Sequence, residues 1–291
     1  MEENNVEEKI ENIAEEIQIS EDEKNEQISI GSPRYPYQIE EEILYYPNNV
    51  NVLRIGDTAP EFSAVTTFGR CNLSDYRGRW LVLFSHPGDF TPVCTTEFMC
   101  FAKYYPRFKE RNCELLGLSI DNINSHLAWV HDIYKNTGIE IPFPVISDKD
   151  ATIANMYNMM SPNMSTTYTV RDVYIICPQG KIRAILTYPA TTGRNIGEIL
   201  RIVEALQTTD NENVATPANW MPKMPTVAFS PSTYQELVER IKDNSSCLNW
   251  YLCFNNSGFQ NLTVSDFSCN DILGQKNEDI QKCKIDSLNE F

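Results

Sequence analysis

The chain has few positive charges and no long apolar segment. Its 291 residues include 24 Lys and Arg against 40 Asp and Glu, a formal net charge of −16. Nucleic acids need basic partners, so this balance argues against a nucleic-acid-binding protein. No apolar run approaches the ~18–20 residues that cross a bilayer, so we expect no membrane-spanning helix and no membrane partner.

The acidic excess is concentrated at the start of the chain. Residues 1–50 contain 14 acidic and 3 basic residues, a net charge of −11. This stretch lacks the cationic start and apolar core of a secretory signal, and it is too acidic for a transit peptide. We expect a solvated tail that is disordered or partly helical, with a partner-docking helix as the alternative.

Paired metal-ligand and redox motifs are also missing. The nine cysteines include no Cys-x-x-Cys pair, which argues against a disulfide reductase. Without a secretory signal, they predict a reducing, cytoplasmic setting and mostly free thiols. His126 and His131 lie five residues apart, which is not a metal-ligand spacing on one helix face. We therefore expect them to be ordinary polar positions, and we expect neither a metal nor a cofactor.

Residues 51–212 alternate strand and helix patterns. This alternation, followed by a hairpin around Pro178–Gly180 and a closing helix, predicts an α/β domain of the thioredoxin-like kind. The expected strands cover 80–84, 113–120, 143–146, 172–177 and 182–187, and the expected helices cover 97–105, 125–136 and 195–206. We expect residues 213–265 to form a smaller C-terminal region, with a helix over 232–242 and a strand over 250–254, and residues 266–291 to form a polar tail.

One cysteine occupies a position that favours reactivity. The apolar strand 80–84 leads through a short loop to Thr91-Pro92-Val93-Cys94, where Thr91 fits an N-cap and Pro92 the first helical position. The N–H groups of a first helical turn lack intrahelical partners, and the helix dipole places partial positive charge there. Such a position favours the thiolate, the reactive form of cysteine. A small buried core residue is the alternative role for Cys94.

The spacing Pro87-x3-Thr91-x2-Cys94 resembles the active-site signature of peroxiredoxins. The longer run from His86 to Glu97 is similar to the one-cysteine subfamily in particular. Further stretches agree with that subfamily in order, and the resemblance covers roughly residues 51–225. These stretches are 56–62, 118–121, 126–129, 188–195 and 215–220.

The resemblance implies a thiol peroxidase with antioxidant function. It would reduce hydrogen peroxide and organic hydroperoxides through a sulfenic acid at Cys94. Thr91 would cap the helix and also contact the sulfur or the peroxide, Arg171 would donate to both, and Pro87 would shield the thiolate. The supporting residues would be His86, near the nucleophile, and the carboxylate–arginine pair of Glu97 and Arg194. A surface salt bridge is the alternative for that pair.

How the sulfenic acid is reduced stays open at this stage. The usual C-terminal Val-Cys-Pro of two-cysteine relatives is missing, and Cys177 ends an expected core strand, so we expect it to be structural. A resolving cysteine in a partner subunit is one route, and an external thiol, either glutathione-like or thioredoxin-like, is the other. The candidates for the first route are Cys247, Cys253, Cys269 and Cys283. The subfamily resemblance implies a homodimer, and the acidic tail motivates an alternative function as a chaperone or a peroxide-sensing relay.

Overall fold

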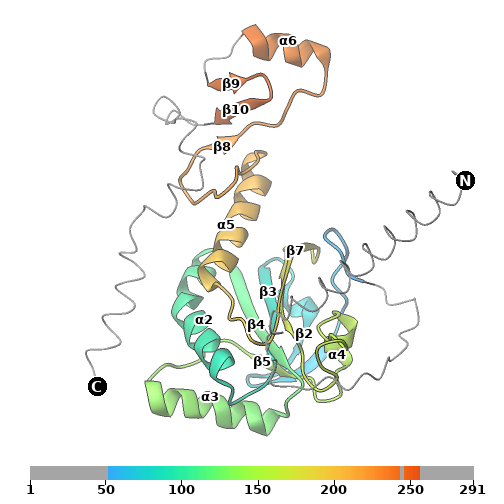
Figure 1. Cartoon of the computed structure of the whole chain (residues 1–291), viewed down its shortest axis with the longest axis vertical. Coiled ribbons are helices and arrows are strands. Elements are labelled where there is room, and N and C mark those ends of the chain that lie inside the picture. The colour runs from blue at the N-terminus through green and yellow to red at the C-terminus, as the bar shows by residue number, and fades with distance from the viewer. Residues whose placement is uncertain (1–51, 243–245, 256–291) are drawn as a thin grey trace, which may run out of the picture. The chain divides into compact units, whose positions relative to one another are not determined.

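The computed structural model describes residues 52–242 and 246–255 of the chain (Figure 1). The expected acidic tail, the expected polar tail and the candidate cysteines Cys269 and Cys283 lie outside these residues. Among the described residues, no helix is both long and apolar enough to cross a membrane.

A mixed seven-stranded sheet forms the main domain, in the order β2-β1-β5-β4-β3-β6-β7. The two central strands, β3 and β4, are parallel and consist entirely of buried residues, which fits their mainly apolar sequence. Strand β6 runs antiparallel to β3 on its other side, and β7 pairs with β6 as an antiparallel hairpin. The strands are β1 (Ser63–Thr66), β2 (Gly69–Asn72), β3 (Trp80–Ser85), β4 (Cys113–Ser119), β5 (Val145–Ser147), β6 (Arg171–Ile176) and β7 (Ile182–Tyr188).

Helices cover both faces of this sheet, each over its own apolar core. The larger core packs α2 (Pro92–Glu110), α3 (Ile123–Thr137) and α5 (Ile196–Glu212) against β3, β4 and β6. The second core lies on the opposite face, under η1 (Leu73–Tyr76), α4 (Thr152–Met156) and the chain before β1. Figure 1 shows α2 and α5 lying alongside each other on their face of the sheet. The predicted α/β architecture is therefore confirmed.

Some elements differ from the sequence prediction. The hairpin β1–β2 and the short helix α4 were not predicted, because neither shows a long periodic apolar pattern. Helix α2 runs five residues past the predicted end, with Pro106 in its interior. Helix α5 likewise continues to Glu212 and ends at Asn213, whose left-handed φ of 53° stops the helix.

The C-terminal region contains a small three-stranded sheet in the order β8-β10-β9, and one helix. These elements are β8 (Thr226–Val227), α6 (Tyr234–Lys242), β9 (Cys247–Asn249) and β10 (Leu252–Asn255). The strand predicted at 250–254 is shifted, because Trp250 and Tyr251 form the turn between β9 and β10. Backbone pairing ties β8 to both the preceding chain and β10, through Ala215–Val227 and Phe254–Val227.

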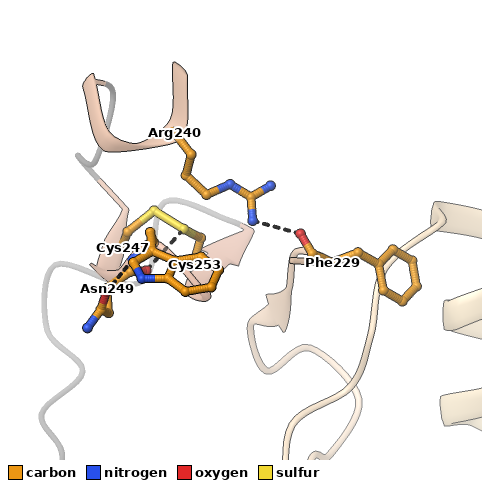
Figure 2. Close-up of a disulfide and its surroundings, with 6 residues drawn as sticks. Phe229, Arg240, Cys247, Asn249 and Cys253 are labelled. Carbon is orange, nitrogen blue, oxygen red and sulfur yellow. Dashed lines mark hydrogen bonds between the residues drawn. A yellow bond between two sulfur atoms is a disulfide. The ribbon is translucent and has the colours of Figure 1, made fainter. Parts of the chain in front are cut away.

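A disulfide joins Cys247 of β9 to Cys253 of β10, which are paired across the two strands (Figure 2). The two cysteines are six residues apart in sequence, and their Cα atoms are 3.9 Å apart. Beside it, the Arg240 guanidinium donates to the carbonyl of Phe229 at 2.7 Å, linking α6 to the chain after β8 (Figure 2). The five other described cysteines form no disulfide, in line with the expected thiols, but the pair itself was not predicted.

Candidate active site

The loop between β3 and α2 carries the predicted nucleophile. Thr91 is the N-cap of α2, Pro92 opens the helix, and Cys94 is its third residue, as the sequence predicted. Cys94 is fully buried. Phe90, the residue before Thr91, is exposed and has a left-handed φ of 55°, a conformation that bulky side chains rarely adopt. The chain thus makes a sharp bend before the helix starts.

Thr91 lies at the predicted place, but its hydroxyl does not cap the helix. No side-chain cap hydrogen bond is present, and the hydroxyl instead donates to the carbonyl of Gly88 at 2.8 Å. The prediction that Thr91 caps an N–H group is therefore wrong. The reason is geometric: the bend at Phe90 brings the Gly88 carbonyl within reach of a hydroxyl that must donate its proton to an acceptor. Pro87 lies one residue before Gly88 in the same bend.

Arg171 brings a guanidinium to the sulfur. Its Nη1 lies 3.2 Å from Cys94 Sγ, although the two residues are 77 positions apart. The antiparallel pairing of β6 with β3 makes this contact possible, since Arg171 opens β6 next to the end of β3. Its Nε and Nη2 both donate to the carbonyl of Ala190, at 3.0 and 2.6 Å. These two bonds fix the direction of the third nitrogen toward the sulfur.

Glu97 lies one helical turn after Cys94 and bridges two arginines. Its Oε2 accepts from Arg171 Nη1 at 2.7 Å and from Arg194 Nη2 at 2.8 Å, and its Oε1 accepts from the Nε and the backbone N–H of Arg194. All three side chains are almost completely buried. Burial raises the pKa of the Glu97 carboxyl, but the charge and hydrogen bonds of Arg194, with the charge of Arg171, outweigh it and leave the pKa lowered.

The predicted pairing of Glu97 with Arg194 is thus present, and it is buried rather than on the surface. Arg194 also donates to the carbonyls of Ser85 and Asp172, which ties the chain before α5 to the ends of β3 and β6. With Cys94 as a thiolate, the cluster holds two negative and two positive charges. The arrangement is electrically balanced only when the sulfur is ionised.

His86 is fully buried at the end of β3, where it belongs to a cluster that the sequence did not reveal. Its Nε2 lies 3.1 Å from Asp89 Oδ1, and His126 Nδ1 lies 3.0 and 2.8 Å from the two oxygens of the same carboxylate. The prediction that His126 is an ordinary polar position is wrong, because its ring is fully buried under the loop. Its remaining nitrogen, Nε2, lies 3.0 Å from the carbonyl of Ile146 in β5.

These three side chains offer two nitrogens and a carboxylate within 4.8 Å of one another, a set that metal sites also use. The sequence spacing addressed only His126 and His131 as possible metal ligands, and these two residues share helix α3 but not a site. His86, Asp89 and His126 come from separate segments. Each nitrogen that faces Asp89 lies at hydrogen-bonding distance from it, so protons alone account for the contacts.

Asp172 is a second buried carboxyl that the sequence did not single out. It follows Arg171 in β6, so its side chain points to the opposite face of the sheet, where it lines a cavity of about 490 Å³. Its Oδ1 has no hydrogen-bond partner among the described residues. Burial raises the pKa of Asp172 to about 6, against the opposing effects of the Thr187 hydroxyl and Arg194.

Three other cysteines of the main domain pack in or against the larger core. Cys113 and Cys177 are buried within it, as predicted for Cys177, and burial raises the pKa of the Cys113 thiol. Cys100 lies on α2, six residues after Cys94, and is half-buried beside the same core.

A buried cysteine at a helix start, next to a guanidinium and on a thioredoxin-like sheet, defines a thiol-dependent oxidoreductase. A sequence model of the AhpC/TSA family matches residues 55–185, and one of the C-terminal domain of 1-Cys peroxiredoxin matches residues 205–244. The chain is 56% identical over 203 residues to "Peroxiredoxin 2" of Caldanaerobacter subterraneus. The aligned part covers 69% of this chain and 92% of that protein. It is 50% identical over 215 residues to a peroxiredoxin of Aquifex aeolicus, covering 70% and 97%.

A solved structure of a yeast mitochondrial 1-Cys peroxiredoxin gives the same result. It matches with a TM-score of 0.64 at 42% identity and covers 71% of this chain and all of that chain. The yeast protein resolves its thiol "via glutathione/thioredoxin systems". This chain belongs to the peroxiredoxin family, in its 1-Cys branch, and is a thiol peroxidase.

Proposed function

We propose that the protein reduces hydrogen peroxide and organic hydroperoxides through a sulfenic acid at Cys94, in antioxidant defence within the cytoplasm. The contact between Arg171 Nη1 and Cys94 Sγ, 3.2 Å long and fully buried, carries this proposal. A guanidinium stays charged at all relevant pH values, so it stabilises the thiolate before the reaction. It also presents donors to the charge that moves onto oxygen during the reaction.

In this proposal each residue of the site has its own role, which its position in the structure supports. The Cys94 thiolate attacks one peroxide oxygen, the O–O bond breaks, and the leaving oxygen takes up a proton to form water or an alcohol. Arg171 stabilises the sulfur and the leaving oxygen. The Thr91 hydroxyl, at the same helix start, donates its own proton to Gly88 and so accepts a hydrogen bond from the bound peroxide. Glu97, itself held by Arg194, keeps Arg171 in place. We assign Pro87 the shielding of the thiolate and His86 a supporting role.

Peroxide consumption by Cys94→Ser tests this assignment, with Cys100→Ser on the same helix as the matched control. We expect the first variant to lose turnover and the second to retain it. Mass spectrometry after one equivalent of peroxide should place a single added oxygen on Cys94 of the native chain. Retained turnover in Cys94→Ser would show that the reaction occurs elsewhere.

We propose that an external thiol, glutathione-like or thioredoxin-like, reduces the oxidised Cys94. One thiol displaces the hydroxyl of the sulfenic acid as water and forms a mixed disulfide, and a second thiol releases the Cys94 thiolate and leaves as a disulfide. The similar yeast protein is linked to both kinds of reductant. Measuring turnover with glutathione and with a thioredoxin system separates the two.

The Cys247–Cys253 pair supports a second route for reducing the oxidised Cys94. This route requires a homodimer, the assembly that the family relationship favours. Reduced Cys247 or Cys253 of one subunit attacks the sulfenic acid of the other and releases water, and the remaining thiol of the pair then frees Cys94. The product of that exchange is the disulfide that the structure contains. Non-reducing peptide mapping after peroxide treatment decides: an intersubunit bond from Cys94 to either residue supports this route, and its absence leaves the external thiol.

A further inference from the structure

The cluster of His86, Asp89 and His126 connects the active-site loop to two other segments of the chain. His126 belongs to the first turn of α3, and Ile146 to β5. The backbone N–H of Asp89 donates to Asp121 Oδ2 at 3.0 Å, and Asp121 also accepts from the Ser119 hydroxyl at 2.7 Å. The Asp89 side chain is 1% exposed and both rings are fully buried. Both ring nitrogens of His126 therefore have partners within the protein.

The two partners of the His126 ring determine where its protons are. A backbone carbonyl only accepts, so Nε2 carries a proton toward Ile146. An ionised carboxylate also only accepts, so Nδ1 carries a proton toward Asp89. A ring with protons on both nitrogens is an imidazolium. Although burial opposes the charge on Asp89, its hydrogen bonds to His126 and His86 lower its pKa and keep it ionised.

The same carboxylate fixes the tautomer of His86. Asp89 Oδ1 accepts from His86 Nε2 at 3.1 Å, so the proton of His86 is on Nε2. Burial lowers the pKa of His86 against the opposing effect of Asp89, so the ring is neutral and its Nδ1 is bare. That Nδ1 has no hydrogen-bond partner among the described residues. The ring is held between Phe98 and Trp129, at centroid distances of 4.8 and 5.2 Å.

We propose that His126 and Asp89 form a buried imidazolium–carboxylate pair that positions the active-site loop and locks His86 as its Nε2–H tautomer. Both are positioning residues: they act through the loop that carries Thr91 and through His86. Their effect on catalysis rests on the proposed peroxidase reaction at Cys94, whereas the protonation states do not. Among the described residues, Asp121, on the loop after β4, is a further charged group beside the pair, and it accepts from the Asp89 backbone N–H.

The protonation states can be read directly, because the chain has only three histidines. We would record long-range ¹H–¹⁵N spectra of the imidazole nitrogens on the full-length, chelator-treated protein between pH 6 and 8.5. His131, which is exposed on the same helix as His126, serves as the internal reference. We expect protons on both nitrogens of His126, as its two acceptors require, and a proton only on Nε2 of His86. A bare nitrogen on His126, from a neutral ring or a bound metal, would overturn the proposal.

Activity gives the second readout. Asp89→Asn removes the charge but keeps the shape, and His126→Gln removes the imidazolium. Their matched controls are the exposed Asp132→Asn and His131→Gln on α3. We expect the rate of peroxide reaction to fall about tenfold or more in the first pair only, as for other losses of an orienting carboxylate. In Asp89→Asn the His86 proton should also no longer be confined to Nε2.

The outcomes separate the two proposals. If Asp89→Asn changes the His86 signals but leaves the rate unchanged, the positioning role is wrong. If Cys94→Ser still consumes peroxide, the proposed function is wrong, and the spectra of the native protein still test the ion pair.

Discussion

At the scale of single residues, the chemistry of the site depends on the balance of charge around Glu97. Among the described residues, this carboxylate is the only acidic side chain that forms an ion pair with both Arg171 and Arg194. Without it, two guanidinium groups would remain buried near a single sulfur. Removing one partner of a buried ion pair costs more than the pair itself contributes, because the other charge is left without compensation.

Glu97→Gln should therefore be both less stable and less active. We expect the free energy of unfolding to fall by about 3–5 kcal/mol, and the peroxide reaction to slow because Arg171 is no longer held against the sulfur. Urea unfolding and peroxide kinetics measure the two effects. Glu110→Gln, an exposed site on the same helix, should change neither, and equal behaviour of the two variants would contradict the assigned role.

Asp172 makes the stability of the protein depend on pH. Its pKa of about 6 in the folded chain lies above the value of an unfolded aspartate. The folded state therefore binds this proton more tightly than the unfolded state does. The contribution of protonated Asp172 to stability is complete below about pH 4 and is lost as pH rises through about 6. Relative to the native protein, the free energy of unfolding of Asp172→Asn should be higher at pH 7.5 than at pH 4.5, by up to about 3 kcal/mol. Urea unfolding of both proteins at the two pH values checks this, and a constant difference between them would refute it.

At the scale of elements, helix α2 combines a favourable start with an unfavourable interior. Pro92 is well placed in its first turn, whereas Pro106 removes a hydrogen bond from the middle of the helix. Pro106 is exposed, so no core packing depends on its ring. The helix persists because its apolar face, including Phe98, Phe101 and Phe108, is completely buried.

Replacing Pro106 with alanine should stabilise the protein by about 1–3 kcal/mol, since the helix regains a backbone hydrogen bond and loses a steric clash. The gain is reduced by the greater freedom of the unfolded chain. Thermal and urea unfolding measure it. Lys103→Ala, at an exposed position one turn earlier, should have little effect. A destabilised Pro106→Ala variant would mean that α2 needs its present curvature.

The sequence predicted most elements. It identified the residues that surround Cys94 but not the buried cluster of Asp89 and His126. Thr91 lies close to Cys94 in the chain, and the resemblance supplied Glu97, Arg171 and Arg194. Asp89 and His126 are brought together only when the loop after β3 packs on α3 and β5. That contact is tertiary and leaves no periodic pattern. The Cys247–Cys253 bond was missed because 250–254 looked like one strand, although Trp250 and Tyr251 turn the chain between two.

At the scale of the whole molecule, the two sheets differ in what stabilises them. The seven-stranded sheet is covered by two apolar cores, whereas the small C-terminal sheet buries few side chains, among them Cys253 and Phe254. A small sheet of this kind gains more from a covalent link than a large one does. We therefore assign the disulfide a local stabilising role in addition to the proposed exchange chemistry.

Changing both Cys247 and Cys253 to serine should loosen the small sheet and leave the main domain intact. Losing a bond that closes so short a loop costs about 2 kcal/mol. Hydrogen exchange should accelerate at the amides of Ala228 and Phe254, which are bonded within this region, and stay unchanged in β3 and β4. A comparable acceleration in those central strands would show that the two sheets unfold together.

The complete burial of Cys94 has a kinetic consequence. A peroxide is small enough to diffuse to a sulfur that large molecules cannot touch, but the thiol of another protein is not. The first turn of the helix must therefore open before such a reductant can reach the oxidised atom. At high reductant concentration, recycling should approach a ceiling set by how often that turn opens, and adding more reductant should then no longer accelerate the cycle.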